Sequence, residues 1–298
     1  MAALFGLSAV FLFYQILGGG LSALIFGFDP SDDDLTALRL MTAAGEILFI
    51  LLPALLLSGF FYRDISSVIR LNRPSVKELL LFSAGMLVLI LLLQTYMYVQ
   101  DFLMDQAAGA FPWFNGLKTE FDKYNQLVEK EYDKLIFGSS LIEKGFIVII
   151  VAVVPAVCEE AFFRGFVQGS FQMKYSGLVS ALITSLFFAL YHMHPYQLLP
   201  LAALGFYFGF ASYKSDSIWI PVLLHFLNNF VAVVLFFIVG ADDIVDVKGA
   251  GNNYYFQAVT AFLVLLVIFI SIVMFINYHY KREYSAAINS TDRIDEDM

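Results

Sequence analysis

Long runs of apolar residues dominate the chain, and polar residues gather between them. Six runs are long enough to cross the roughly 30 Å hydrocarbon core of a bilayer as helices. They cover residues 4–26, 41–62, 79–99, 145–171, 218–239 and 255–278. Two shorter runs, 178–192 and 198–210, are separated by a His-Met-His-Pro sequence and predict short helices that the other spans bury. The pattern predicts an all-α polytopic membrane protein with about eight transmembrane helices.

The composition agrees with an integral membrane protein. Hydrophobic residues make up 60% of the 298 residues and charged residues only 14%, whereas about 25% of the residues of a soluble domain are charged. The net charge of −9 argues against nucleic acid as a partner, because nucleic-acid-binding proteins need clustered Lys and Arg. The lipid bilayer is therefore the expected surrounding of the chain.

The distribution of Lys and Arg predicts the orientation in the membrane. An even number of spans places both termini on one side. The basic residues of the short connections and the tail on that side are Arg63, Arg70, Arg73, Lys77, Lys174, Lys214, Lys281 and Arg282. By the positive-inside rule this side, with both termini, is cytoplasmic. No endoplasmic-reticulum retention signal is present at the C-terminus, which favours a bacterial plasma membrane.

Three ionisable residues inside the run 145–171 are the strongest chemical signal. Glu159 and Glu160 are adjacent, and Arg164 follows four residues later. Each ionised side chain near the centre of a membrane helix costs about 2.5 to 3.5 kcal/mol, so such residues must be paired or used. On a helix Glu160 and Arg164 share a face, while Glu159 points about 100° away. We expect Glu160 and Arg164 to form a structural ion pair that leaves Glu159 free to take a proton.

The histidine of the next short run can reach Glu159. If the turn between the two helices is centred near Tyr175, Glu159 and His192 lie at similar depths, roughly 24 to 26 Å along an antiparallel hairpin. The count predicts that the two side chains meet. His194, two residues later and beside Pro195, is expected to have an interface or capping role.

His225 and Asn229 are four residues apart in the run 218–239 and therefore share a helix face. Both side chains donate hydrogen bonds, so the pair could hold the oxyanion of a tetrahedral intermediate. Counted along the helix from Ser217, however, His225 lies only about 12 Å deep in the membrane, which is shallower than Glu159. Convergence with Glu159 then requires tilted helices or a helix that begins inside the protein.

Four short motifs follow one another on these segments. They are Glu159-Glu160-x-x-x-Arg164, Phe188-x-x-x-His192, Phe206-x-x-Gly209 and His225-x-x-x-Asn229. In this order and in a membrane setting they resemble the motifs of the CPBP family of intramembrane proteases, which includes CAAX-prenyl endopeptidases and bacterial proteins linked to bacteriocin processing and self-immunity. The resemblance implies hydrolysis of a peptide bond within the bilayer. The positions of Glu159 and His192 would activate water, and those of His225 and Asn229 would stabilise the oxyanion.

The chain is interpreted as one membrane-embedded domain over residues 1–284, followed by a flexible polar tail over 285–298. The catalytic core is expected within 145–239, and the first three spans are interpreted as scaffold. Residues 100–144 form a long extracytoplasmic loop. Apolar residues at three- and four-residue spacing within 117–135 predict an amphipathic helix in this loop, and a covering helix is favoured over a lid that gates the substrate.

Dependence on a metal is left open by the residues. Glu159, His192 and His225 could be ligands of a divalent ion such as zinc, and the family is often described as metalloproteases. The usual zinc signature, two His on one helix turn with a Glu between them, is missing. Direct catalysis by glutamate, with no cofactor, is therefore favoured over a metal-dependent version of the same protease.

The sequence thus predicts an intramembrane endopeptidase whose partners are the bilayer and a peptide or protein substrate that is membrane-associated or lipid-modified, as in a CAAX protein. Two other classes compete with it. A non-catalytic bacteriocin-immunity protein would bind its partner without Glu159, whereas a protease requires this residue. An ion or proton transporter would need a polar path to both faces, whereas this chain has one closed polar cluster.

Overall fold

The computed structural model describes residues 1–27, 34–240 and 252–296, and every regular element in these ranges is a helix. Within these ranges, six helical segments are long and apolar enough to cross a membrane. They are Ala2–Phe26, Leu35–Tyr62, Val76–Ala110, Leu141–Gln172, Trp219–Val239 and Tyr254–Arg282. The all-α polytopic membrane fold is confirmed, while the count of eight spans and the cytoplasmic position of the termini stay predictions. The two shorter predicted runs are α11 (Gly177–Tyr191) and α12 (Leu198–Ser215).

The first two spans are each built from three helical pieces. The first comprises α1 (Ala2–Val10), η1 (Phe11–Gly18) and α2 (Gly19–Phe26), and the second comprises α3 (Leu35–Glu46), η3 (Ile47–Leu51) and α4 (Leu52–Tyr62). The short α5 (Ile65–Ile69) leads to α6 (Val76–Ala110), which begins with a Ser75–Glu78 capping box. The η segments are π-helical, with a wider hydrogen-bond ring than an α-helix.

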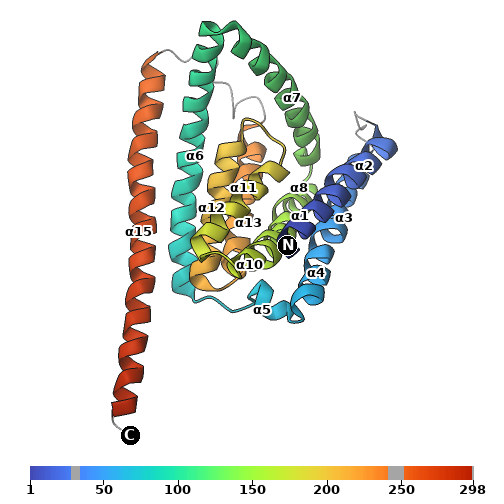
Figure 1. The fold of residues 1–298 in the computed structure, drawn as a ribbon. Helices are drawn as coiled ribbons and strands as arrows, with labels where there is room; N and C mark the ends of the chain where they lie inside the picture. The colour runs from blue at the N-terminus through green and yellow to red at the C-terminus, as the bar shows by residue number, and fades with distance from the viewer. Residues whose placement is uncertain (28–33, 241–251, 297–298) are drawn as a thin grey trace.

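The central helices are enclosed by the others. The fourth span contains α8 (Leu141–Val148), η4 (Ile149–Val153), α9 (Val154–Glu160), η5 (Ala161–Val167) and α10 (Gln168–Gln172). It packs with the α11–α12 hairpin and with α13 (Trp219–Val239), while α6 and α15 (Asn252–Glu296) lie side by side on one flank (Figure 1). The last helix continues to Glu296, and the flexibility expected of the polar segment 285–298 stays a prediction. Extending an existing helix avoids the nucleation cost, so polar residues can continue it.

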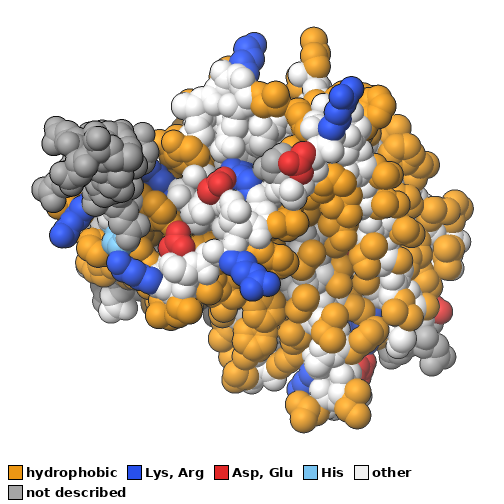
Figure 2. Space-filling view, turned by 90° about the horizontal axis from the view of Figure 1, so that it is seen from below, with side chains coloured by type: hydrophobic (Ala, Val, Ile, Leu, Met, Phe, Trp, Pro, Cys, Tyr) orange, Lys and Arg blue, Asp and Glu red, His pale blue; other side chains and the backbone are white. Residues whose placement is uncertain are grey.

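The connections predicted to be cytoplasmic meet at one end of the molecule. The Arg70 guanidinium donates to the Gln172 side chain at 3.1 Å, and Asn72 donates to the carboxylate of Asp216 at 3.0 Å. Tyr280, near the predicted end of the last span, donates to Glu78 at the start of α6. Figure 2 shows the molecule from below, with basic and acidic side chains interspersed among hydrophobic ones. The connections that carry the predicted positive charge therefore lie together.

The amphipathic helix of the long loop is α7 (Pro112–Ile136), and it lies against the connection between α11 and α12. The Tyr196 hydroxyl donates to Asp122 on α7, and the Gln100 amide donates to the Tyr196 carbonyl at 2.9 Å. At the other end of α7, Arg39 of the second span donates to the carbonyl of Leu135 at 2.9 Å. The predicted helix is confirmed, and its contacts are those of a covering helix.

Close packing of α12 against its neighbours depends on Gly209. A Cβ at this position would lie 2.9 Å from the Ala181 Cβ on α11 and 2.9 Å from the Gln168 Oε1 on α10. The close approach of α12 to α10 also lets the Gln168 amide donate to the Gly209 carbonyl at 3.0 Å. This explains the glycine in the Phe206-x-x-Gly209 motif.

We expect Gly209→Ala to destabilise the protein by about 1 to 3 kcal/mol, because the Ala181 Cβ is fixed to its backbone and the helices must move apart. Thermal unfolding in detergent measures the effect. Gly145→Ala is the matched control, since a Cβ there meets no atom within 4 Å. A similar loss of stability in both variants would contradict the packing argument.

Candidate active site

Pro155 interrupts the fourth span just before the two glutamates. A proline has no N–H, so it cannot make the usual helical bond to the carbonyl four residues earlier, which is that of Val151. The Asn229 amide of α13 donates to this carbonyl at 3.1 Å. Two π-helical segments, η4 and η5, flank α9, and such segments are frequent at functional sites. The irregular helix therefore anchors α13 beside Glu159 and Glu160.

Glu160 is the centre of a fully buried ionic network. Its Oε1 accepts from Arg164 Nη1 at 2.9 Å, and both side chains are 0% exposed. The same oxygen lies 2.8 Å from His225 Nδ1. The Glu160–Arg164 pair predicted from the helical spacing is confirmed. The contact with His225 was not predicted, and it ties α13 to the fourth span.

Arg164 is also held by α11 and α12. Its Nη2 donates to the Gly205 carbonyl at 3.1 Å, and its guanidinium carbon lies 4.5 Å from the centre of the Phe188 ring and 5.2 Å from that of Phe208. Cation–π contacts of this kind gain strength where water is excluded. Arg164 thus contacts α11 and α12 directly, and through Glu160 it is linked to His225 on α13.

Glu159 and His192 face each other at the accessible part of the site. The Glu159 Oε2 lies 3.9 Å from the His192 Nε2, and the side chains are 13% and 31% exposed. The distance exceeds that of a direct hydrogen bond and leaves room for one small group that contacts both atoms. The meeting of the two residues, predicted by counting along the hairpin, is confirmed. Their exposure distinguishes them from the buried Glu160 and Arg164.

His192 is oriented by the end of its own helix. Helix α11 ends at Tyr191, and the His192 Nδ1 lies 2.7 Å from the Phe188 carbonyl, one of the carbonyls that a helix C-terminus leaves without a helical partner. A carbonyl only accepts, so Nδ1 carries the proton. In the neutral ring Nε2 is then the basic nitrogen, and this is the atom that faces Glu159.

His225 and Asn229 reach the site because α13 begins inside the protein. Ser217 and Ile218, at its start, are buried, and the Ile218 amide donates to the Arg70 carbonyl at 2.9 Å. His225 is thereby brought to Glu160, and Asn229 to the Val151 carbonyl. Asn228, beside Asn229, donates to the Asn229 side-chain oxygen at 3.1 Å.

Three residues of the first two spans also belong to the site, although these spans were expected to be scaffold alone. The Tyr14 hydroxyl donates to Glu46 at 2.7 Å, and α3, which Glu46 ends, packs against α9, which carries Glu159. The Gln15 amide donates to the carbonyl of Tyr191, the residue before His192, at 2.6 Å. A signal for Glu46 was present in the sequence, because it is an acidic residue inside an otherwise apolar run.

The ligand set predicted for a metal is assembled only in part. Glu159 and His192 are close enough to bind one ion, given metal–ligand distances of about 2.0 to 2.2 Å for zinc. The Nδ1 of His225, the third predicted ligand, bonds to Glu160, so only its Nε2 could bind a metal. Among the described residues no group of three His, Cys, Asp or Glu side chains is arranged to hold a metal ion.

Comparison with known proteins agrees with the motifs. The family model "Type II CAAX prenyl endopeptidase Rce1-like" matches residues 142–231, which include every predicted site residue. Over 88 residues the chain is 30% identical to the protein named "Putative membrane peptidase YdiL" from Bacillus subtilis (strain 168). The aligned part is 30% of this chain and 36% of that protein, so the match spans about a third of the relative. No solved structure matches the chain. Over residues 142–231 the chain therefore resembles the CPBP family of intramembrane proteases, of the Rce1-like type.

Proposed function

We propose that the protein is an intramembrane endopeptidase that hydrolyses a peptide bond of a membrane-associated or lipid-modified, CAAX-like substrate. The facing pair of Glu159 and His192 carries this proposal. A carboxylate and an imidazole 3.9 Å apart can both contact one water molecule. Their partial exposure inside a membrane span allows a substrate to reach them.

In the proposed reaction Glu159 is the general base. Its carboxylate takes a proton from water while the water oxygen bonds to the carbonyl carbon of the substrate. The His192 Nε2 accepts a hydrogen bond from the same water and fixes its position. When the C–N bond breaks, the leaving amine receives the proton that Glu159 had taken. Because the protein already holds the water between two fixed groups, less entropy is lost when the transition state forms.

His225 and Asn229 are proposed to stabilise the negative oxygen of the intermediate. Glu160, ionised beside Arg164, accepts from the His225 Nδ1, so this nitrogen carries a proton. His225 can then donate through Nε2 only as the imidazolium, which shares the Glu160 carboxylate with Arg164. The Asn229 amide donates to the Val151 carbonyl with one N–H and has a second N–H for the substrate.

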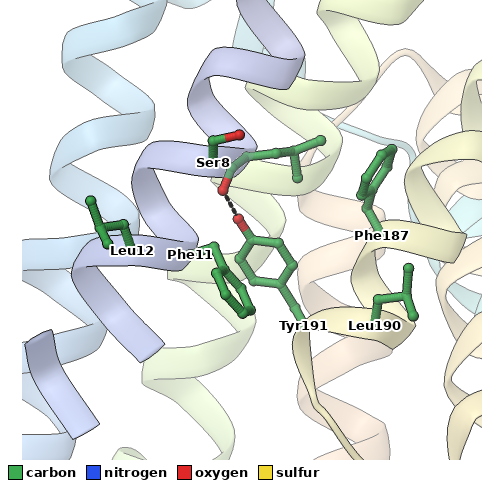
Figure 3. A pocket seen from close by; sticks show the side chains of 7 residues that line it. Ser8, Phe11, Leu12, Phe187, Leu190 and Tyr191 are labelled. Carbon is green, nitrogen blue, oxygen red and sulfur yellow. Dashed lines mark hydrogen bonds between the residues drawn. The ribbon is translucent and has the colours of Figure 1, made fainter. Parts of the chain in front are cut away.

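A pocket of about 470 Å³ suggests where the lipid part of a substrate could lie. It is between the first span and α11, and its lining is almost wholly apolar: Leu7, Ser8, Phe11, Leu12, Phe187, Leu190 and Tyr191 (Figure 3). The Tyr191 hydroxyl donates to the Leu7 carbonyl across one side of the pocket. Neither Glu159 nor His192 lines this pocket, and Tyr191, which precedes His192 in the chain, is its link to the proposed catalytic pair.

The proposal is tested by cleavage of a prenylated fluorogenic peptide by purified protein in detergent. We expect turnover by the wild type that is lost in Glu159→Gln and His192→Ala and unaffected by a chelator. Loss of activity on chelation with rescue by zinc would replace direct glutamate catalysis with the metal-dependent alternative. Equal background cleavage by all three folded proteins would contradict the proposed function for this substrate.

We expect Asn229→Ala to lower kcat by about 10²- to 10³-fold with little change in KM, because an oxyanion donor acts in the transition state. Steady-state kinetics on the same peptide measure this. Asn115→Ala is the matched control, an identical change at an exposed position of α7, and should cost much less. If both variants lose the same activity, the assignment of Asn229 as the donor is wrong.

A further inference from the structure

The connection between α11 and α12, residues 192–197, begins with His192 and bends sharply after it. The bond from the His192 ring to the Phe188 carbonyl sets the rotation of the side chain, but the place of its backbone depends on the connection. Met193, the next residue, has a φ of +50°, a left-handed conformation that a residue with a Cβ adopts only at a cost. Such a conformation persists where the surrounding structure holds it. The contacts that hold this connection therefore bear on the active site.

Three side chains from other parts of the chain fix the two ends of the connection. At its start, the Gln15 amide of the first span donates to the Tyr191 carbonyl at 2.6 Å. At its end, the Gln100 amide of α6 donates to the Tyr196 carbonyl at 2.9 Å, and the Tyr196 hydroxyl donates to Asp122 of α7. All three partners lie outside the part of the chain that the family model matches. The family resemblance therefore does not include these contacts.

Tyr196 joins the connection to both α6 and α7, and its residue is only 7% exposed. Its ring packs edge to face against Phe121 of α7, with the ring centres 6.2 Å apart. The carboxylate that accepts from its hydroxyl is itself fixed, because Asp122 pairs with Lys118 at 2.9 Å, and Lys118 also pairs with Asp105 of α6 at 3.1 Å. A hydrogen bond to a carboxylate is stronger than one between neutral groups. The two helices thus give the end of the connection a firm support.

We propose that Tyr196 is a positioning residue of the active site. Its bonds to α6 and α7 hold the connection in the bend that places the His192 Nε2 at 3.9 Å from the Glu159 carboxylate. The inference rests on the proposed function, in which His192 fixes the attacking water. It gives α7 a second role besides covering the domain.

The Tyr196→Phe variant removes the hydroxyl and keeps the ring. We expect kcat for the prenylated peptide to fall about 10- to 100-fold with KM unchanged, because a displaced member of the catalytic pair slows chemistry and not binding. Tyr124→Phe, the same change at an exposed position of α7, is the matched control and should keep the wild-type kcat. Wild-type kcat in Tyr196→Phe, or a change in KM alone, would overturn the proposal.

The acceptor of the bond gives a test by conservative replacement. Asp122→Asn keeps a side-chain oxygen that can accept from the tyrosine, whereas Asp122→Ala removes it. We expect kcat to stay within about threefold of the wild type in Asp122→Asn, and to fall in Asp122→Ala as far as in Tyr196→Phe. Both changes break the same bond, so the double variant with Tyr196→Phe and Asp122→Ala should lose no more than either single variant. Losses of kcat that multiply in the double variant would contradict the proposal.

NMR spectra of the protein with ¹³C-labelled histidine give a readout that needs no proteolytic activity. The His192→Ala and His279→Ala variants identify the signals of these two residues by their disappearance. We expect Tyr196→Phe to shift the His192 signal and to leave that of His279, on α15, in place. If the wild type cleaves no peptide, the proposed function fails, but this shift still supports the positioning of His192 by Tyr196. An unmoved His192 signal would overturn the proposal, whatever the activity.

Discussion

Glu159→Gln is expected to abolish nearly all turnover, with a fall in kcat/KM of about 10²- to 10⁴-fold, the contribution of a positioned general base. Glutamine has the shape of glutamate but cannot accept a proton at its amide. The side chain is 13% exposed and is not part of the buried Glu160–Arg164 pair, so the variant should fold. Single-turnover and steady-state cleavage of a prenylated peptide measure the loss, and unfolding temperature measures the fold.

The matched control is Glu120→Gln, the same chemical change on α7. Glu120 makes an exposed ion pair with Lys123, with both side chains more than 60% exposed, and such pairs contribute little. Its variant should keep wild-type kcat and KM. A folded Glu159→Gln variant as active as this control would remove Glu159 from the mechanism.

The contacts that could be predicted from the sequence are those fixed by distance along the chain. Glu160 and Arg164 meet because four residues make about one helical turn. Glu159 and His192 meet because a tight turn at the end of α10 sets the register of an antiparallel hairpin, so counting from the turn gives the depth of each residue. In both cases the geometry of a single helix or a single hairpin suffices.

The contacts that were missed join helices that are far apart in the sequence. The His225–Glu160 bond spans 65 residues and the Tyr14–Glu46 bond spans 32. Which faces of two membrane helices meet depends on their rotation and tilt, and these are set by packing with neighbours. Apolar sequences such as the first two spans contain no pattern that fixes this rotation. The isolated acid Glu46 indicates a functional position but not the residue it faces.

We expect Arg164→Met to be the most destabilising substitution in the site, at about 3 to 5 kcal/mol, the usual cost of removing one partner of a buried ion pair. Both Arg164 and Glu160 are 0% exposed. Without the guanidinium, Glu160 retains only the contact with His225, and the Gly205 carbonyl loses its donor. The unfolding temperature in detergent measures the effect. Arg73→Met, at an exposed position before α6, is the control and should unfold like the wild type.

The double variant Arg164→Met with Glu160→Gln distinguishes the cost of an unpaired charge from the loss of packing. Neutralising Glu160 removes the uncompensated charge, so the double variant should be more stable than Arg164→Met alone, with a coupling energy of about 1 to 3 kcal/mol. If the two losses of stability simply add, Glu160 is not ionised in the wild type. A neutral Glu160 would not stabilise the His225 imidazolium. Without that charge His225 could not donate through Nε2, and its proposed role as an oxyanion donor would be wrong.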